Sequence, residues 1–292
     1  MSSKVMTAAV LGLNCELVEV EADTTPMLPK FFIVGLPDKS VDESKERVRS
    51  AIKNSGFKMP RAKITINLAP ADLRKEGPAY DLPIAVSILL TTKQLFLAES
   101  IAKPEKQIFI GELALNGRLR PVNGVLSVCL AAKEQGIKNI YLPHRNAAEA
   151  TLIKGLNIYP CKNLSQLVKH LSGKDLIKPF VIKKETLLEK STLMSIYDMA
   201  YVKGQHHVKR ALEIAAAGSH NVLLSGPPGA GKTLLAKTMA SILPAMTTAE
   251  SLEVTRVYSV AGILPNNKPL ITDRPFRSPH HTASGVAVTI AR

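Results

Sequence analysis

One segment of eight residues constrains the fold of this chain more than any other. It fits the pattern G-x-x-x-x-G-K-[ST] and consists of Gly226, Pro227, Pro228, Gly229, Ala230, Gly231, Lys232 and Thr233. An apolar run at residues 222–224 precedes it, and an amphipathic segment follows from Lys232. A glycine-rich turn between a buried strand and a helix lets backbone N–H groups point at phosphate oxygens. The segment therefore predicts a P-loop within an α/β fold.

The chemistry of a P-loop assigns a role to its last two residues. Lys232 would reach the β- and γ-phosphates of a nucleotide, and the hydroxyl of Thr233 would bind Mg²⁺. The expected cofactors are therefore ATP and Mg²⁺. The alternative is a glycine-rich turn with a chance lysine, and the strand and helix that flank the segment argue against it.

Hydrolysis of ATP requires more than the P-loop. An acidic pair that follows an apolar strand normally holds the metal and positions the attacking water. The acidic residues after Thr233 are Glu250, Glu253 and Asp273, none of them follows such a strand, and the sequence ends at Arg292. We therefore expect this chain to bind ATP without hydrolysing it and expect no catalytic residue in it.

The length of 292 residues and the alternating pattern predict two domains. We expect an α/β unit at residues 1–172, a lysine-rich linker at 173–195 and a second unit at 196–292. The expected strands are residues 6–10, 17–20, 31–35, 63–68, 108–113, 139–142 and 221–225. The expected helices are a segment that starts at a capping box at residues 40–43 and stops at Gly56, and then residues 82–90, 125–134, 163–171, 205–217 and 232–243. Asn116 and Gly117 predict a hairpin turn.

Charge and cysteine content limit the classes of partner and compartment. The net charge is +14, with an excess of +8 in residues 1–182 and +6 in the remainder. This balance favours a polyanionic partner such as nucleic acid, and an ordinary basic protein is the alternative. The three cysteines form no C-x-x-C pair, which fits a reducing cytoplasm, and no apolar run is long enough to cross a membrane.

Several segments resemble one protein family. They are FIVGLPD at 32–38, ERVRSA at 46–51, NLAPADL at 67–73 and RPFRSPHHT at 274–282, together with the P-loop. The chain is similar over residues 6–284 to the YifB/ComM family of magnesium-chelatase-like AAA+ ATPases. The resemblance implies an N-terminal ribosomal-S5-like, Lon-protease-like domain, followed by the first part of a P-loop AAA+ domain that assembles as a hexamer. It also implies that Gly204 and Gln205, in a hydrophobic-x-Gly-Gln element, contact the adenine.

The function that the resemblance implies is ATP-driven DNA branch migration during natural transformation, on branched or single-stranded DNA. Two other functions compete with it. One is a chelatase-type or protein-remodelling AAA+ ATPase, and the other is a degenerate Lon-like scaffold that binds nucleotide. Whether the chain is an enzyme depends on ATP hydrolysis, which the family carries out.

The sequence departs from the family pattern at two kinds of position. Ala79 stands where the Lon-like motif has its serine and Leu126 where it has its lysine, so we expect no peptidase dyad. Residues 285–292 drift away from the family, which continues with a glycine triplet and Walker B. We therefore expect a truncated form without Walker B, the sensors and the arginine finger.

The remaining charged residues allow two interpretations each. Possible DNA contacts are Arg274, Arg277, His280 and His281. The arginines could instead bind neighbouring acidic groups, and adjacent histidines on a strand point to opposite faces and rarely share a metal ion. The basic residues at positions 45, 47, 49 and 53 alternate with acidic ones on an expected helix, which indicates a solvated face.

Overall fold

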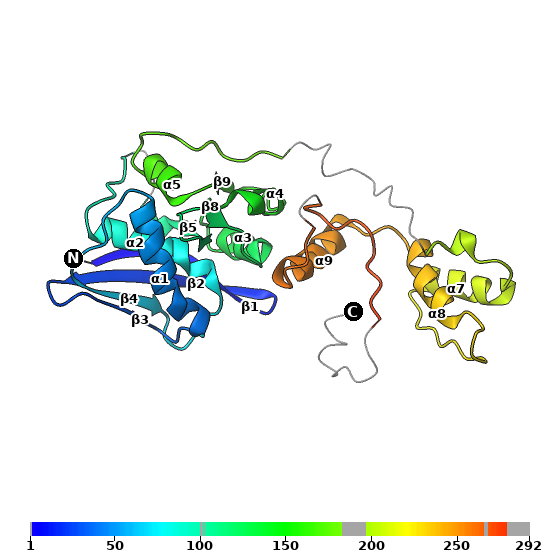
Figure 1. Ribbon diagram of the computed structural model, residues 1–292. Helices are drawn as coiled ribbons and strands as arrows, with labels where there is room; N and C mark the ends of the chain where they lie inside the picture. The colour runs from blue at the N-terminus through cyan, green and yellow to red at the C-terminus, as the bar shows by residue number, and fades with distance from the viewer. Residues whose placement is uncertain (1, 100, 102, 183–196, 266–267, 279–292) are drawn as a thin grey trace. The chain divides into compact units, whose positions relative to one another are not determined.

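The computed structural model describes residues 2–99, 101, 103–182, 197–265 and 268–278 (Figure 1). The chain divides into two compact units. The first comprises residues 1–187 and 253–270, and the second comprises residues 188–252 and 271–292. Each unit is described by itself. In the described ranges, no helix combines the length and the apolar character that crossing a membrane requires.

The first unit is built on a mixed, mostly parallel sheet with the strand order β3-β4-β2-β1-β5-β8-β9. The β3–β4, β1–β5, β5–β8 and β8–β9 pairs are parallel, whereas β1–β2 and β2–β4 are antiparallel. The strands are β1 (Ser2–Leu11), β2 (Asn14–Thr25), β3 (Lys30–Val34), β4 (Lys63–Ala69), β5 (Gln107–Phe109), β8 (Asn139–Pro143) and β9 (Asn157–Cys161). The unit is therefore an α/β fold, as predicted.

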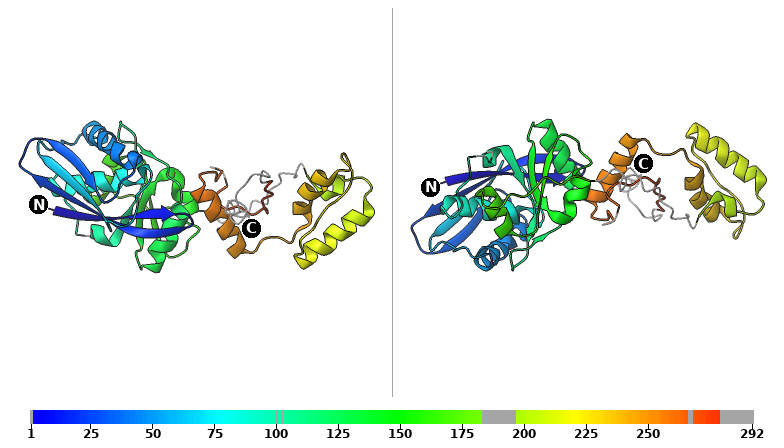
Figure 2. Two further views of the ribbon diagram at one scale, coloured as in Figure 1. Left: turned by 90° about the horizontal axis from the view of Figure 1, so that it is seen from below. Right: turned by 90° about the horizontal axis from the view of Figure 1, so that it is seen from above.

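Helices cover both faces of this sheet (Figures 1 and 2). Along β1, Val5 and Ala9 belong to the core beneath α1, α2 and α5, whereas Ala8 belongs to the core beneath α3 and α4. This alternation follows from the two-residue period of a strand. The helices are α1 (Lys39–Asn54), α2 (Asp81–Thr91), α3 (Val125–Glu134), α4 (Ala147–Ala150) and α5 (Leu164–Leu171).

Most expected elements of the first unit are present, although β9 and α4 were not expected and two expected boundaries differ. Helix α1 begins two residues earlier than the expected capping box, because Asp38 is the N-cap and its carboxylate accepts from the Val41 N–H at 2.7 Å. The expected strand at residues 108–113 is split, because the chain turns at Gly111 between β5 and β6 (Glu112–Leu113). Strand β6 pairs with β7 (Leu119–Arg120) through the predicted turn, where Gly117 has a φ of +80°.

A segment late in the chain also packs on the first unit. Helix α9 (Thr248–Val260) ends in this unit, where the carbonyl of Ser259 accepts from the Gly124 N–H at 3.0 Å. The guanidinium of Arg256 donates to the Ser127 hydroxyl at 3.0 Å and to the carbonyl of Leu13. These contacts hold residues 253–270 against the turn before α3.

The second unit contains α7 (His206–Gly218) and α8 (Lys232–Thr238), which share a small apolar cluster, and the start of α9. The expected strand at residues 221–225 is wrong. These residues form no strand, and the side chain of Leu223 is 93% exposed. An isolated parallel strand leaves its backbone groups unpaired. The described residues of this unit supply no neighbouring strand for it to pair with.

Candidate functional site

The P-loop of the second unit has the backbone conformation that its glycines permit. Gly226, Gly229 and Gly231 have φ angles of +157°, +79° and +80°, a region that residues with a side chain rarely occupy. Gly231 is the residue before α8, and its carbonyl accepts the Leu235 N–H at 2.9 Å, which starts the helix. The loop therefore leads directly into a helix N-terminus, where free N–H groups and the helix dipole favour anions.

Lys232 lies over this loop rather than pointing into solvent. Its Nζ atom donates to the carbonyl of Gly226 at 2.8 Å and to that of Pro227 at 2.7 Å. The side chain of Thr233 is exposed on the first turn of α8. The structure thus places the ammonium group and the hydroxyl at the same end of α8 as the glycine turn, which is the donor set that a triphosphate with Mg²⁺ requires.

The hydrophobic-x-Gly-Gln element lies in the same unit as the P-loop helix and packs on it. Met199 and Val202 share an apolar cluster with Leu235 of α8. The Met199 N–H also donates to the Ser241 hydroxyl at 3.0 Å. Gly204 and Gln205 follow with φ angles of +65° and +56° and lead into α7. The structure therefore brings together the two segments that the sequence assigns to one nucleotide.

Two of the charged residues after the P-loop, Glu250 and Arg274, are bound to one another. Glu250 accepts from Arg274 at 3.0 Å and from the Thr247 N–H at 2.7 Å, and these hydrogen bonds lower the pKa of its carboxyl. Arg274 also donates to the carbonyl of Pro244 at 2.7 Å. Arg277 lies within the described residues, whereas His280 and His281 lie outside them. The bonds of Arg274 link it to the first turn of α9 and to the segment before it.

A second candidate site lies in the first unit, around the residue that replaces the Lon-like serine. A hollow of about 620 Å³ is lined by Ala79, by the acidic residues Asp38, Glu76 and Glu112, and otherwise mostly by apolar residues. Leu126 does not line it, because its side chain is fully buried in the core beneath α3. Ala79 offers a methyl group and Leu126 an isobutyl group, so neither can act as a nucleophile or a base.

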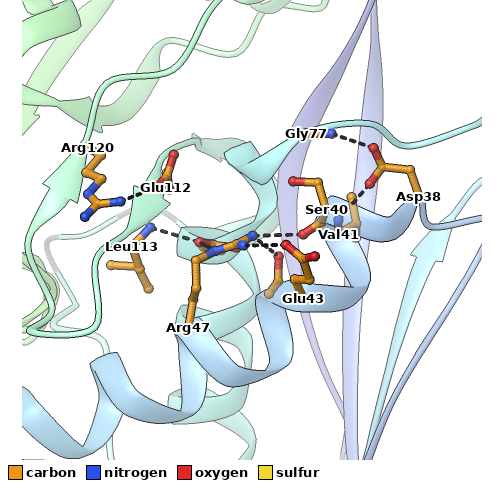
Figure 3. Close-up of polar contacts among 11 residues, drawn as sticks. Asp38, Ser40, Val41, Glu43, Arg47, Gly77, Glu112, Leu113 and Arg120 are labelled. Carbon is orange, nitrogen blue, oxygen red and sulfur yellow. Dashed lines mark hydrogen bonds and ion pairs between the residues drawn. The ribbon is translucent and has the colours of Figure 1, made fainter.

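An ion pair between Arg47 and the buried Asp81, among the polar contacts of Figure 3, links α1 to the first residue of α2. Arg47 of α1 donates to both carboxylate oxygens of Asp81, at 2.7 and 3.1 Å. The fully buried Asp81 also accepts from the Leu113 N–H at 3.0 Å. The expectation of a solvated basic face on this helix is therefore wrong for Arg47. The partner is 34 residues away in the sequence, so no local pattern could have indicated the pair.

Asp38 supplies a further connection beside the hollow. One of its oxygens caps α1 and the other accepts from the Gly77 N–H at 3.2 Å (Figure 3). Together with the ion pair, this bond fixes the loop that carries Ala79. Among the residues that the structure describes, no group of three histidine, cysteine or acidic side chains is arranged to hold a metal ion.

Comparison with known proteins extends these observations to nearly the whole chain. Two models of the magnesium chelatase subunit ChlI match residues 20–146 and 198–290. The competence protein ComM of Haemophilus influenzae is 43% identical over 284 residues, which are 96% of this chain and 54% of ComM. YifB of Escherichia coli is 42% identical over 286 residues, or 98% of this chain and 54% of YifB. The chain thus spans about half the length of these relatives.

A more distant relative matches part of the chain. Lon protease 2 of Bacillus subtilis is 26% identical over 181 residues, which are 56% of this chain and 32% of the protease. The models and the relatives agree with the segments that first suggested the family. The chain belongs to the magnesium-chelatase-like AAA+ family that includes ComM and YifB.

Proposed function

We propose that this protein binds ATP–Mg²⁺ through its second unit and is part of an AAA+ motor that acts on DNA. The observation that carries the proposal is the P-loop, where Lys232 lies over the glycine turn and Thr233 lies on the first turn of α8. The phosphates would contact the N–H groups of residues 229–233, and Thr233 would bind the metal. Gly204 and Gln205, held near α8 by the shared apolar cluster, would contact the adenine.

We further propose that the 292-residue polypeptide binds ATP without turnover. In the described part of the second unit, no acidic side chain follows a strand. Glu250 is bound to Arg274 and to the backbone of Thr247, so it is not placed to orient a water molecule. Binding without hydrolysis is expected of a P-loop that lacks, among the described residues, the acidic pair that positions the attacking water.

DNA is the proposed substrate because two independent observations favour it. The net charge of +14 is spread over both parts of the chain, and such a charge attracts polyanions. The relative ComM bears the name of a competence protein. Branch migration on branched or single-stranded DNA, hexamer assembly and a cytoplasmic location belong to this proposal. Arg274 and Arg277 are proposed DNA contacts, with His280 and His281 beside them in sequence.

A protein-remodelling motor is the second candidate, and the relation to Lon protease 2 favours it. On either reading, we propose that residues 1–172 form a ribosomal-S5-like, Lon-protease-like domain that has lost its dyad. The proposed division continues with a linker at 173–195 and an AAA+ domain from residue 196 onward.

Two measurements separate these functions. Thr233→Ala should weaken the binding of a fluorescent ATP analogue with Mg²⁺ and leave its binding without metal unchanged, because the hydroxyl serves the metal. Forked DNA and an unfolded polypeptide, each labelled, should then be titrated with the full chain. Binding of the polypeptide with no binding of DNA at low salt would replace the DNA motor with a protein-remodelling one.

A further inference from the structure

A polar hollow of about 430 Å³ lies on the first unit, away from the Ala79 site. Three segments meet there: the end of α1 at Asn54 and Ser55, the turn between β6 and β7, and the first turns of α5. Every residue that lines the hollow is polar, and Asp175 is the single carboxylate among them. An all-polar lining of this size fits a hydrated, charged ligand better than an apolar one.

Three of the four amide side chains in the lining have their oxygen bound to a backbone N–H; the fourth, Asn54, instead donates its NH₂ to the carbonyl of Leu115. The Oδ1 atom of Asn116 accepts from the Arg118 N–H at 3.1 Å, and that of Asn163 accepts from the Gln166 N–H at 2.8 Å. The Oε1 atom of Gln166 accepts from the Lys162 N–H at 2.9 Å. Backbone N–H groups can only donate, so these bonds fix each amide orientation. Within the described residues, the three amide NH₂ groups have no partner.

Two cations complete this donor set. Arg118 and Lys169 line the hollow, both are exposed, and neither forms an ion pair with another described residue. By contrast, Arg49, Arg74 and Arg120 of the same unit each lie within 3.4 Å of a carboxylate. The hollow thus combines a guanidinium, an ammonium and three amide donors, which is the chemistry that binds phosphate oxygens.

The backbone holds these donors in place. The carbonyl of Gly117 accepts from the Leu164 N–H at 2.9 Å, and that of Lys162 accepts from the Leu119 N–H at 2.9 Å. The Asn54 amide donates to the carbonyl of Leu115 at 2.7 Å. A Cβ atom at Gly117 would lie 2.3 Å from the Ser55 hydroxyl oxygen, so the turn packs closely on the end of α1. The three segments therefore form one pre-ordered surface.

We propose that this hollow binds the phosphodiester backbone of nucleic acid. Exposed lysines at positions 53, 162 and 174, each adjacent in sequence to a lining residue, extend the positive surface along a polyanion. The lining contains no aromatic or aliphatic side chain, which argues against a protein partner and against base stacking. The contact is therefore with phosphates and carries no sequence preference. The inference rests on the proposed action on DNA and names the surface that holds it.

The test uses the full chain and a short fluorescent duplex in a salt series. Arg118→Gln/Lys169→Gln removes two phosphate contacts, so the slope of log K against log salt should fall in magnitude by about 2. When the salt concentration is raised from about 50 to about 200 mM, the factor by which DNA affinity falls should be about ten times smaller for this variant than for the wild type. The matched control is Arg61→Gln/Lys133→Gln, which removes two exposed cations of the same unit outside the hollow and should leave the slope unchanged.

A gain of affinity provides a second readout that misfolding cannot imitate. Asp175→Asn removes the single carboxylate of the lining and should strengthen DNA binding several-fold, whereas Asp72→Asn, exposed elsewhere on the unit, should not. Equal slopes for the wild type and the Arg118/Lys169 variant would overturn the inference and leave the DNA function standing. Saturable binding of inorganic phosphate with unchanged DNA affinity in the variant would assign the hollow to a free anion and overturn it as well. Failure of the wild type to bind DNA at low salt would refute both.

Discussion

Replacement of Arg47 by methionine keeps an apolar stem of similar length and removes the guanidinium that neutralises Asp81. The carboxylate is fully buried and would retain only uncharged partners, the Leu113 N–H at 3.0 Å and the side chain of Ser44. Loss of one partner of a buried pair costs about 3–5 kcal/mol, because the other charge stays desolvated. The Arg47 side chain is 19% exposed, so water reaches it and the lower end, about 3 kcal/mol, is expected.

The measurement is urea unfolding followed by far-ultraviolet circular dichroism. The matched control is Arg49→Met on the same helix, whose exposed ion pair with Glu46 spans 3.4 Å and should be worth less than about 1 kcal/mol. Arg47→Met/Asp81→Asn should be less destabilised than Arg47→Met alone, because it leaves no buried charge. A loss below about 1 kcal/mol for Arg47→Met, or a double variant less stable than the single one, would refute this reasoning.

Three further predictions follow from the first unit. Burial raises the pKa of the Glu149 carboxyl from 4.5 to about 7, so the folded state favours the protonated form. The free energy of unfolding is therefore unaffected by this group below pH 4.5 and decreases as the pH rises towards and beyond about 7. In the wild type, this group should lower the free energy of unfolding by up to about 3 kcal/mol between acidic and mildly alkaline pH. In Glu149→Gln, the urea midpoint should no longer decrease over that pH range. Burial lowers the pKa of His170, whose Nδ1 accepts from the Ile177 N–H at 3.0 Å, so the folded state favours the neutral imidazole. The stabilisation that His170 provides is therefore complete above about pH 6.5 and is lost as the pH falls. In His170→Gln, the urea midpoint should decrease less as the pH falls below about 6.5. An unchanged pH dependence would show that protonation of His170 is not coupled to unfolding. Incubation with an unfolded protein should give no cleavage, because Ala79 and Leu126 cannot form a dyad, and fragments that persist after repurification would contradict this.

The strands and helices of the first unit were predictable where their signals are local. Residues 81–91 are apolar almost throughout, and all but one side chain of α2 is buried. Asn116 and Gly117 predicted the hairpin between β6 and β7, and the positive φ of Gly117 is what that dipeptide supplies. The alternating sequence predicted β4, and in the structure its buried positions alternate with half-buried ones over 7 residues.

Elements that depend on distant partners were not predictable. Strand β9 was missed because Pro160 interrupts it, and a proline is tolerated there because β9 is an edge strand. The apolar run at residues 222–224 predicted a strand, but such a run forms a strand only where a neighbouring strand can accept and donate its backbone hydrogen bonds. Hydropathy alone could not show whether that neighbour is present.

The candidate sites divide in the same way. The P-loop was predictable residue by residue because its chemistry lies in one continuous segment, Gly226 to Thr233. The polar hollow on the first unit was not predictable, because its lining residues, among them Asn54, Asn116 and Gln166, come from three separate segments. Only the backbone hydrogen bonds to the oxygens of Asn116, Asn163 and Gln166 reveal that these three amides present their NH₂ groups to the hollow.

Calorimetric titration of the full chain with ATP–Mg²⁺ tests the central claim most directly. The wild type should bind one nucleotide per chain, and Lys232→Ala should bind none, because the ammonium over the loop is the charge that pairs with the phosphates. The matched control is Lys237→Ala on the same helix, whose ammonium lies 4.7 Å from the Tyr197 ring and away from the loop, and it should bind as the wild type does. Phosphate release, followed in the same samples, should stay at background. Absence of binding by the wild type, or equal binding by Lys232→Ala, would contradict the account.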